Sequence, residues 1–122
     1  DRTGWWGVAL DSDDPEGLAR FYAALLGWTY RVHDDTWVTL ASDTGTTYLA
    51  CALDERYVEP VWPSEAGRPT MQAHLDVEVD DLEVSVADAL ALGARLAPFQ
   101  PQEAVRVLLD PAGHPFCLYL AG

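Results

Sequence analysis

The sequence contains no lysine, no isoleucine and no asparagine, and all seven of its basic residues are arginine. Without lysine, the chain cannot form a Schiff base between a lysine amine and a carbonyl substrate, which excludes that class of covalent catalysis. No run of apolar residues approaches the roughly 18 that a membrane-spanning helix needs, so we expect no contact with a membrane.

Positive charge is scarce: the sequence has seven arginines and 20 acidic residues, and its formal net charge is −13. Proteins that bind nucleic acid hold phosphates with clustered cations, and the arginines here are scattered, so no nucleic-acid partner is expected. The acidity is typical of a soluble surface, and it would also steer cationic ligands toward the protein.

Cysteine is also rare, since Cys51 and Cys117 are the only two. Two cysteines do not make the disulfide framework of a small secreted domain. The first residues, 1–4, lack the basic and apolar regions of a signal peptide. We therefore expect a cytoplasmic protein.

The order of predicted elements is strand, helix and three strands, and it occurs twice. In the first half, Asp14 caps a helix that ends at Gly27. In the second half, Asp81 and Gly93 have the same roles. The predicted strands cover residues 5–10, 29–33, 36–41, 47–53, 71–79, 95–97, 104–109 and 115–120.

The halves also align residue by residue, with Gly7 at the position of His74 and Gly45 at that of Gly113, which indicates an internal duplication. A unit of this size would struggle to bury its sheet alone. We therefore expect one domain over residues 1–122, with module one at about 5–53, a linker at about 54–70 and module two at about 71–121.

Several motifs in this order resemble a known superfamily. The motifs are Val8-Ala9-Leu10, Asp14-Pro15-Glu16, Phe21-Tyr22, Leu26-Gly27-Trp28, His74-Leu75-Asp76-Val77, Val79-Asp80-Asp81 and Asp110-Pro111-Ala112-Gly113-His114-Pro115-Phe116. They resemble the vicinal oxygen chelate superfamily, which includes glyoxalase I, ring-opening dioxygenases and the bleomycin-resistance proteins. The resemblance implies an α+β fold of two tandem βαβββ modules, whose curved mixed sheets surround a cavity with helices on the outer face. It also implies a homodimer.

Metal-using members of that superfamily place ligands at four positions. By resemblance, these positions are Gly7, Leu49 or Cys51, His74 and Cys117. Gly7 and Leu49 cannot coordinate an ion, so we expect neither a metal nor another cofactor. In an alternative register, Cys51, His74 and Cys117 would form a zinc site.

Strand alternation predicts which side chains would contact a ligand. The predicted lining is Trp5, Trp37, Leu49, His74, Asp76, Arg106, Cys117 and Tyr119. Arg106 could bind a ligand carboxylate or neutralise Asp76 or Glu78. The alternate residues are expected to form the core beneath the helices. These are Val8, Leu10, Leu75, Val77 and Val79.

His74, Asp76 and Glu78 share one face of a predicted strand and are the candidate catalytic residues. Such a set could act as a general base or hold a ligand amine, or it could be the hydrogen-bonded lining of a wet cavity. We expect His114, next to a turn, to make a local structural contact. The sequence favours a metal-independent protein that binds an aromatic or hydrophobic organic molecule. The alternative is a lyase or oxygenase of the glyoxalase/dioxygenase type that uses His74, with or without a metal.

Overall fold

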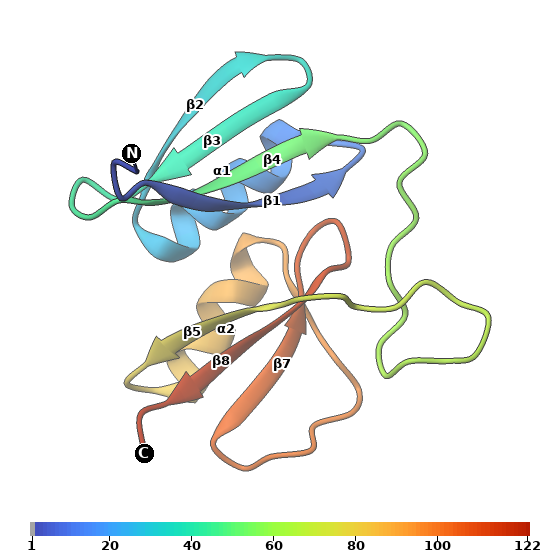
Figure 1. Ribbon diagram of the computed structural model, residues 1–122. Helices are drawn as coiled ribbons and strands as arrows, with labels where there is room; N and C mark the ends of the chain where they lie inside the picture. Colours follow the sequence, from blue (N-terminus) through green and yellow to red (C-terminus); the bar gives the residue numbers. More distant parts are fainter. Residues whose placement is uncertain (1) are drawn as a thin grey trace. The chain divides into compact units, whose positions relative to one another are not determined.

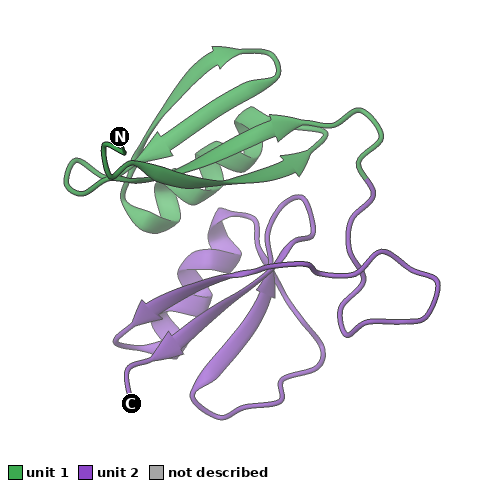
Figure 2. Ribbon diagram, viewed as in Figure 1, with its two compact units in different colours: residues 1–57 green, residues 58–122 purple. Residues whose placement is uncertain are grey.

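The computed structural model describes residues 2–122. The chain divides into two compact units, the first ending at Tyr57 and the second beginning at Val58 (Figure 2). Each unit contains one helix on one face of a four-stranded mixed sheet (Figure 1). The predicted α+β fold of two tandem βαβββ modules is confirmed. No helix in the described part of the chain is long and apolar enough to span a membrane.

The first unit, module one, has its strands in the order β1-β4-β3-β2, with β1 parallel to β4 and the other neighbours antiparallel. Its elements are β1 (Trp6–Ser12), α1 (Pro15–Leu26), β2 (Thr29–Asp34), β3 (Trp37–Ala41) and β4 (Thr47–Leu53).

Helix α1 begins and ends where the sequence predicts. The Asp14 carboxylate accepts a hydrogen bond of 3.0 Å from the backbone N–H of Gly17, and proline occupies the first turn. Gly27 ends the helix with a φ of 70°, a left-handed conformation that costs glycine little. The helix buries Leu18, Phe21 and Tyr22.

The buried face of the first sheet is fixed by the pairing of β3 with β4. Val38 lies opposite Cys51, and Leu40 lies opposite Leu49. Directly paired residues point to the same side of a sheet, and all four are buried. The expectation that Leu49 and Cys51 line the other face with Trp37 is therefore wrong, because these side chains belong to the core beneath α1.

The second unit, module two, has the strand order β5-β8-β7-β6. Its elements are β5 (Leu75–Val79), α2 (Leu82–Leu92), β6 (Arg95–Leu96), β7 (Val105–Leu109) and β8 (Pro115–Leu120). As predicted, Asp81 caps α2 by accepting from the N–H of Val84 at 3.1 Å, and Gly93 follows the helix with a φ of 117°. Regular strand β5 begins only at Leu75, not at Met71.

The core of module two lies between its sheet and α2. Phe116 and Leu118 of β8 are buried, together with Leu108 of β7, which pairs with Phe116. The pairing of β5 with β8 adds Leu75 and Val77 to the same face. The prediction that Leu75 and Val77 face the helix is thus confirmed.

The turn between β7 and β8 is held by a buried carboxylate. Asp110, 0% exposed, accepts hydrogen bonds from the N–H groups of Ala112 and His114 at 2.9 and 3.0 Å. It also contacts Nδ1 of His114 at 2.8 Å. The expected structural role of His114 is confirmed.

Candidate functional site

The candidate site lies on the face of the second sheet opposite its core, which we call the helix-free face of module two. Asp76 of β5 pairs with Cys117 of β8, and Glu78 pairs with Tyr119. On the other side of β8, Val107 of β7 pairs with Cys117. Since paired residues point to one side, these side chains share the helix-free face. Sequence alternation had placed Asp76, Glu78, Cys117 and Tyr119 together in this way.

His74 precedes β5 and joins this face through Asp76. Its Nε2 lies 3.1 Å from Oδ1 of Asp76, and the two side chains are 37% and 57% exposed. One donor atom from each of His74, Asp76 and Cys117 can be chosen so that all three lie within 4.8 Å of one another. The structure therefore brings together a nitrogen, an oxygen and a sulfur from three of the predicted site residues.

The thiol of Cys117 is protonated at neutral pH. Its pKa is raised to about 11, first because burial removes water from the thiolate and then because Asp76 repels the negative charge and hydrogen-bonds the thiol. A thiol with such a pKa has very little of the reactive thiolate. Nucleophilic catalysis by Cys117 is accordingly not expected.

A pocket of about 170 Å³ adjoins this group of side chains. Its apolar wall comprises Trp62, Met71, Pro101, Val105, Val107 and Pro115. His74, Gln102 and Cys117 supply its polar groups. The pocket is thus largely apolar, with a few polar side chains that could orient a ligand.

Trp62 brings the segment between the modules into the site. Its ring centroid lies 5.8 Å from that of Phe99, and Val61 pairs with Thr70 in an isolated bridge. The expected linker at 54–70 is thus divided, because the chain from Val58 onward belongs to the second unit. From its place in the linker, Trp62 could be expected either to close over a cavity or to cap the core, and alternation alone did not place Trp62, Met71 or Pro101 in the pocket. In the structure, none of the three lies in a regular strand.

Contrary to the sequence expectation, Arg106 does not lie on the same face of the sheet as Asp76 and Cys117. It pairs with Leu118 and so lies on the core side of the sheet. Its Nη1 donates to the carbonyl oxygens of Glu103 at 2.9 Å and Val105 at 2.8 Å. Its role is local, and it neither neutralises Asp76 nor joins the pocket lining.

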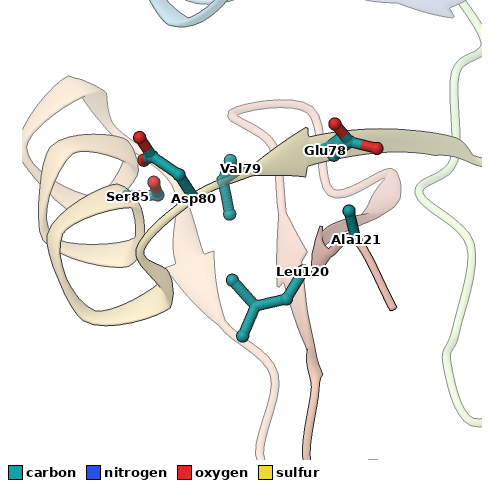
Figure 3. A pocket seen from close by; sticks show the side chains of 6 residues that line it. All are labelled: Glu78, Val79, Asp80, Ser85, Leu120 and Ala121. Carbon is teal, nitrogen blue, oxygen red and sulfur yellow. The ribbon is translucent and has the colours of Figure 1, made fainter.

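Glu78 is also among the residues that line a different pocket of module two. Its other lining residues are Val79, Asp80, Ser85 of α2, Leu120 and Ala121 (Figure 3). Glu78 is not among the three residues whose donor atoms lie close together. Of the catalytic candidates, only His74 and Asp76 are in contact.

The predicted aromatic residues of module one, Trp5 and Trp37, are both exposed in their own unit. Trp37 pairs with Ala52 and lies on the face of the first sheet opposite α1, as expected from alternation. Trp5 precedes β1. Their contact with a ligand remains a proposal.

The metal-ligand positions of the superfamily that the sequence resembles are not occupied by suitable ligands in module one. In module one, Ala50 of β4 pairs with Ala9 of β1. In module two, Cys117 of β8 pairs with Asp76 of β5, the residue that corresponds to Ala9 in the duplication. The residue of module one that corresponds to Cys117 is therefore Ala50, and neither Leu49 nor Cys51. At Gly7, a Cβ atom would lie 2.5 Å from the ring of Tyr48, which fills that place. Module one therefore offers no ligand atom at the positions of Gly7 and Ala50. The alternative zinc site of Cys51, His74 and Cys117 is wrong, because Cys51 lies on the face of its sheet that α1 covers.

Comparison with known proteins agrees with this architecture. The sequence matches the family described as "Glyoxalase-like domain" over residues 7–119. No curated protein matches the sequence.

Solved structures share the fold at low sequence identity. The fosfomycin resistance protein FosX from Mesorhizobium loti is 17% identical, with a TM-score of 0.69, over 100% of this chain and 95% of that chain. A glyoxalase/bleomycin resistance protein/dioxygenase family enzyme from Burkholderia phytofirmans PsJN is 22% identical, with a TM-score of 0.67, over 93% and 95%. Lactoylglutathione lyase from Agrobacterium tumefaciens is 16% identical, with a TM-score of 0.62, over 98% and 95%.

Proposed function

Because the chain belongs to the family of glyoxalase-like domains, we propose that it binds a small aromatic or hydrophobic organic molecule in the pocket of module two. The proposal further holds that binding does not depend on a metal. The similar structures include both a resistance protein and a lyase, so the fold alone does not choose the activity. The pocket, and not the fold, therefore supports this proposal.

The observation that carries the proposal is the apolar wall built by Trp62, Met71 and Val107 beside the polar group of His74. The pocket volume of about 170 Å³ is close to that of an apolar cavity of about 150 Å³ that accommodates benzene. It is below the roughly 300 Å³ at which pockets for drug-sized ligands begin. We therefore expect a ligand with one ring inside the pocket and its remainder outside.

The polar end of the pocket indicates the charge of the ligand. Asp76 does not itself line the pocket, but its carboxylate lies 3.1 Å from Nε2 of His74, which does, and Arg106 lies on the core side of the sheet. A carboxylate without a neighbouring guanidinium repels anions. We expect neutral or cationic ligands, such as phenols and aromatic amines, to bind better than aromatic carboxylates of the same size.

Independence from a metal is supported by module one, where Tyr48 fills the place beside Gly7 and Ala50 has no donor atom. A catalytic metal site normally needs three protein ligands with one open position. Since two of the four positions are lost, we propose that the organic ligand is held by direct contacts with the protein.

A metal-free enzyme is the second candidate, and the contact between His74 and Asp76 favours it. A carboxylate 3.1 Å from Nε2 fixes the orientation of the imidazole and leaves Nδ1 to accept a proton from a substrate. In this case His74→Gln should abolish turnover of a bound compound while its affinity falls little.

A thermal-shift screen in the presence of a chelator tests the proposed function. A matched series of small phenols, aromatic amines and aromatic carboxylates should contain compounds that raise the Tm, because a ligand that binds only the folded state stabilises it. Trp62→Ala should remove the shift. If no compound raises the Tm, or if Trp62→Ala leaves every shift intact, the proposed pocket is not the site.

Trp37→Phe serves as the comparison in this screen. It changes an exposed aromatic residue of module one and leaves the pocket of module two untouched. A shift that Trp37→Phe also reduces would show that module one contributes to the same ligand site, as the sequence predicted. An unchanged shift would confine the site to module two.

We also propose that residues 1–122 act as one cytoplasmic domain and that the protein is a homodimer. Val84, Leu90 and Leu92 of α2 are exposed and apolar, as expected of a surface that a partner covers. Sedimentation at tens of micromolar (roughly the range in which stable dimers persist) should give the mass of two chains. A monomer there would contradict the dimer.

A further inference from the structure

One wall of the pocket belongs to a surface segment, residues 98–104, which lies between β6 and β7 and which we call the pocket loop. Pro101 and Gln102 are its lining residues. Ala97 and Val107, on either side of the loop, are 2% and 5% exposed, whereas no side chain within the described stretch 98–104 is buried. Packing in the core therefore does not fix the position of the loop, and hydrogen bonds must do so.

The side chain of Gln100 makes these hydrogen bonds in the middle of the loop. Its Nε2 donates to the carbonyl oxygens of Val107 at 2.8 Å and Ala97 at 2.9 Å. Its Oε1 accepts from the backbone N–H of Val107 at 2.9 Å. Only one orientation of the amide satisfies all three partners, since the N–H group donates and the carbonyl oxygens accept.

Gln100 takes the place of a strand residue where β6 has ended. Strand β6 is only two residues long and pairs with the end of β7. The backbone N–H of Ala97 adds a last bond of 3.0 Å to the carbonyl oxygen of Val107. The Gln100 amide then pairs with both backbone polar groups of Val107, as a residue of a neighbouring antiparallel strand would.

These hydrogen bonds act on the pocket at two places. The side chain of Val107 lines the pocket, and so do Pro101 and Gln102, which directly follow Gln100 in the chain. One amide therefore sets the position of the loop wall relative to the strand wall.

The far end of the pocket loop is held by other groups. Nη1 of Arg106 donates to the carbonyl oxygen of Glu103 at 2.9 Å, and the N–H of Leu120 donates to that of Ala104 at 3.0 Å. These contacts do not involve Gln100. Loss of its amide should thus free the first half of the loop and leave β7 paired with β8.

We propose that Gln100 is a positioning residue of the ligand site, which holds Pro101 and Gln102 in place and so restricts the pocket of about 170 Å³ to a single ring. The inference rests on the function proposed above and names the size of ring system that the site accepts. Gln100 is not itself a lining residue of the pocket, so it acts through its two neighbours. Without its amide the wall is free to move outward, which admits a second fused ring and removes contacts from a one-ring ligand.

Binding of phenol and of 2-naphthol to the 122-residue chain, measured by calorimetry in the presence of a chelator, tests this inference. Gln100→Met keeps the length of the side chain but removes the amide. We expect the ratio of the two Kd values to shift toward 2-naphthol by about tenfold, the scale on which an apolar pocket discriminates ligand size. Gln72→Met is the matched control and should keep the parental ratio, because the Gln72 amide bonds to Thr70 at 2.7 Å outside the pocket lining.

Gln100→Glu separates the hydrogen bonds from the shape of the side chain. An ionised carboxylate accepts from the N–H of Val107 but cannot donate to the carbonyl oxygens of Val107 and Ala97, whereas a protonated carboxyl donates to one of them. The neighbouring carbonyl oxygens favour the protonated form. The Kd ratio of this variant, relative to the parent at the same pH, should therefore return toward the parental value as the pH falls from about 8 to about 5. A role in stability alone would lower the Tm without changing the ratio.

An unchanged Kd ratio in Gln100→Met, or an equal loss of both compounds, would overturn the inference and leave the proposed pocket standing. A ratio in Gln100→Glu that stays constant between about pH 8 and about pH 5 would overturn it as well, and this result holds even if Gln100→Met folds poorly. If the parent binds neither compound, the proposed function itself fails and the inference fails with it, which is seen before any variant is made.

Discussion

Val107 of β7 lies directly opposite Cys117 of β8, and this pairing decides the face of every side chain on β7. Since neighbours along a strand alternate, Val107 belongs to the pocket and Arg106 belongs to the core side. The predicted charge preference of the ligand and the role of Arg106 both depend on this register.

Arg106→Ala should loosen the segment before β7 without a selective effect on anionic ligands. The variant loses the hydrogen bonds from the guanidinium to the carbonyl oxygens of Glu103 and Val105. We expect a loss of about 1 kcal/mol in the free energy of unfolding, measured in urea. A selective loss of affinity for aromatic carboxylates would instead place Arg106 in the ligand site.

Val77→Asp should destabilise the protein by about 2–3 kcal/mol, because it puts a carboxylate on the core side of β5 opposite Leu118. The neighbouring change Asp76→Asn, on the helix-free face, should alter stability far less. Urea unfolding of both variants measures the difference. Equal effects would contradict the assignment of the two faces.

Alkylation of Cys117 should be slow at pH 8 and should accelerate up to about pH 11, the value to which its pKa is raised. The measurement uses a Cys51→Ser background, in which Cys117 is the remaining thiol. Asp76→Asn should increase the rate at pH 8, since it removes the charge and the hydrogen bond that oppose ionisation, although burial still holds the pKa up. An unchanged rate would show that Asp76 does not act on this thiol.

The same raised pKa has a consequence for stability. A thiol whose pKa is higher in the folded state than its ordinary value of 9.0 favours folding below that pH. This contribution should decline as the pH rises from about 9 to about 11. Cys117→Ser should flatten that part of the stability profile, compared with Cys51→Ser.

Gly7→Ala should destabilise module one, because the added Cβ would lie 2.5 Å from the ring of Tyr48. The expected cost is about 1–2 kcal/mol, the usual scale for overpacking. Tyr48→Leu should relieve the clash, so the double variant should lose less than the two single variants together. Additive losses would mean that the Tyr48 ring does not fill the space beside Gly7.

Local sequence signals determined the modules and the identity of part of the site. Asp14 and Gly27 predicted the ends of α1, because a side-chain cap and a left-handed residue act within one turn. Likewise, the alternation of Asp76 with Leu75 and Val77 assigned both faces of β5, since polar and apolar residues strictly alternate there.

Only the tertiary structure decided the faces of β4 and β7 and the wall of the pocket. In β4, Leu49, Ala50 and Cys51 are all buried, so an apolar run carries no signal of which side each residue faces. The hydrogen-bonded partner strand sets that register. Trp62 has no strand periodicity at all, and it reaches the pocket because residues far apart in the sequence, such as Phe99, pack against it.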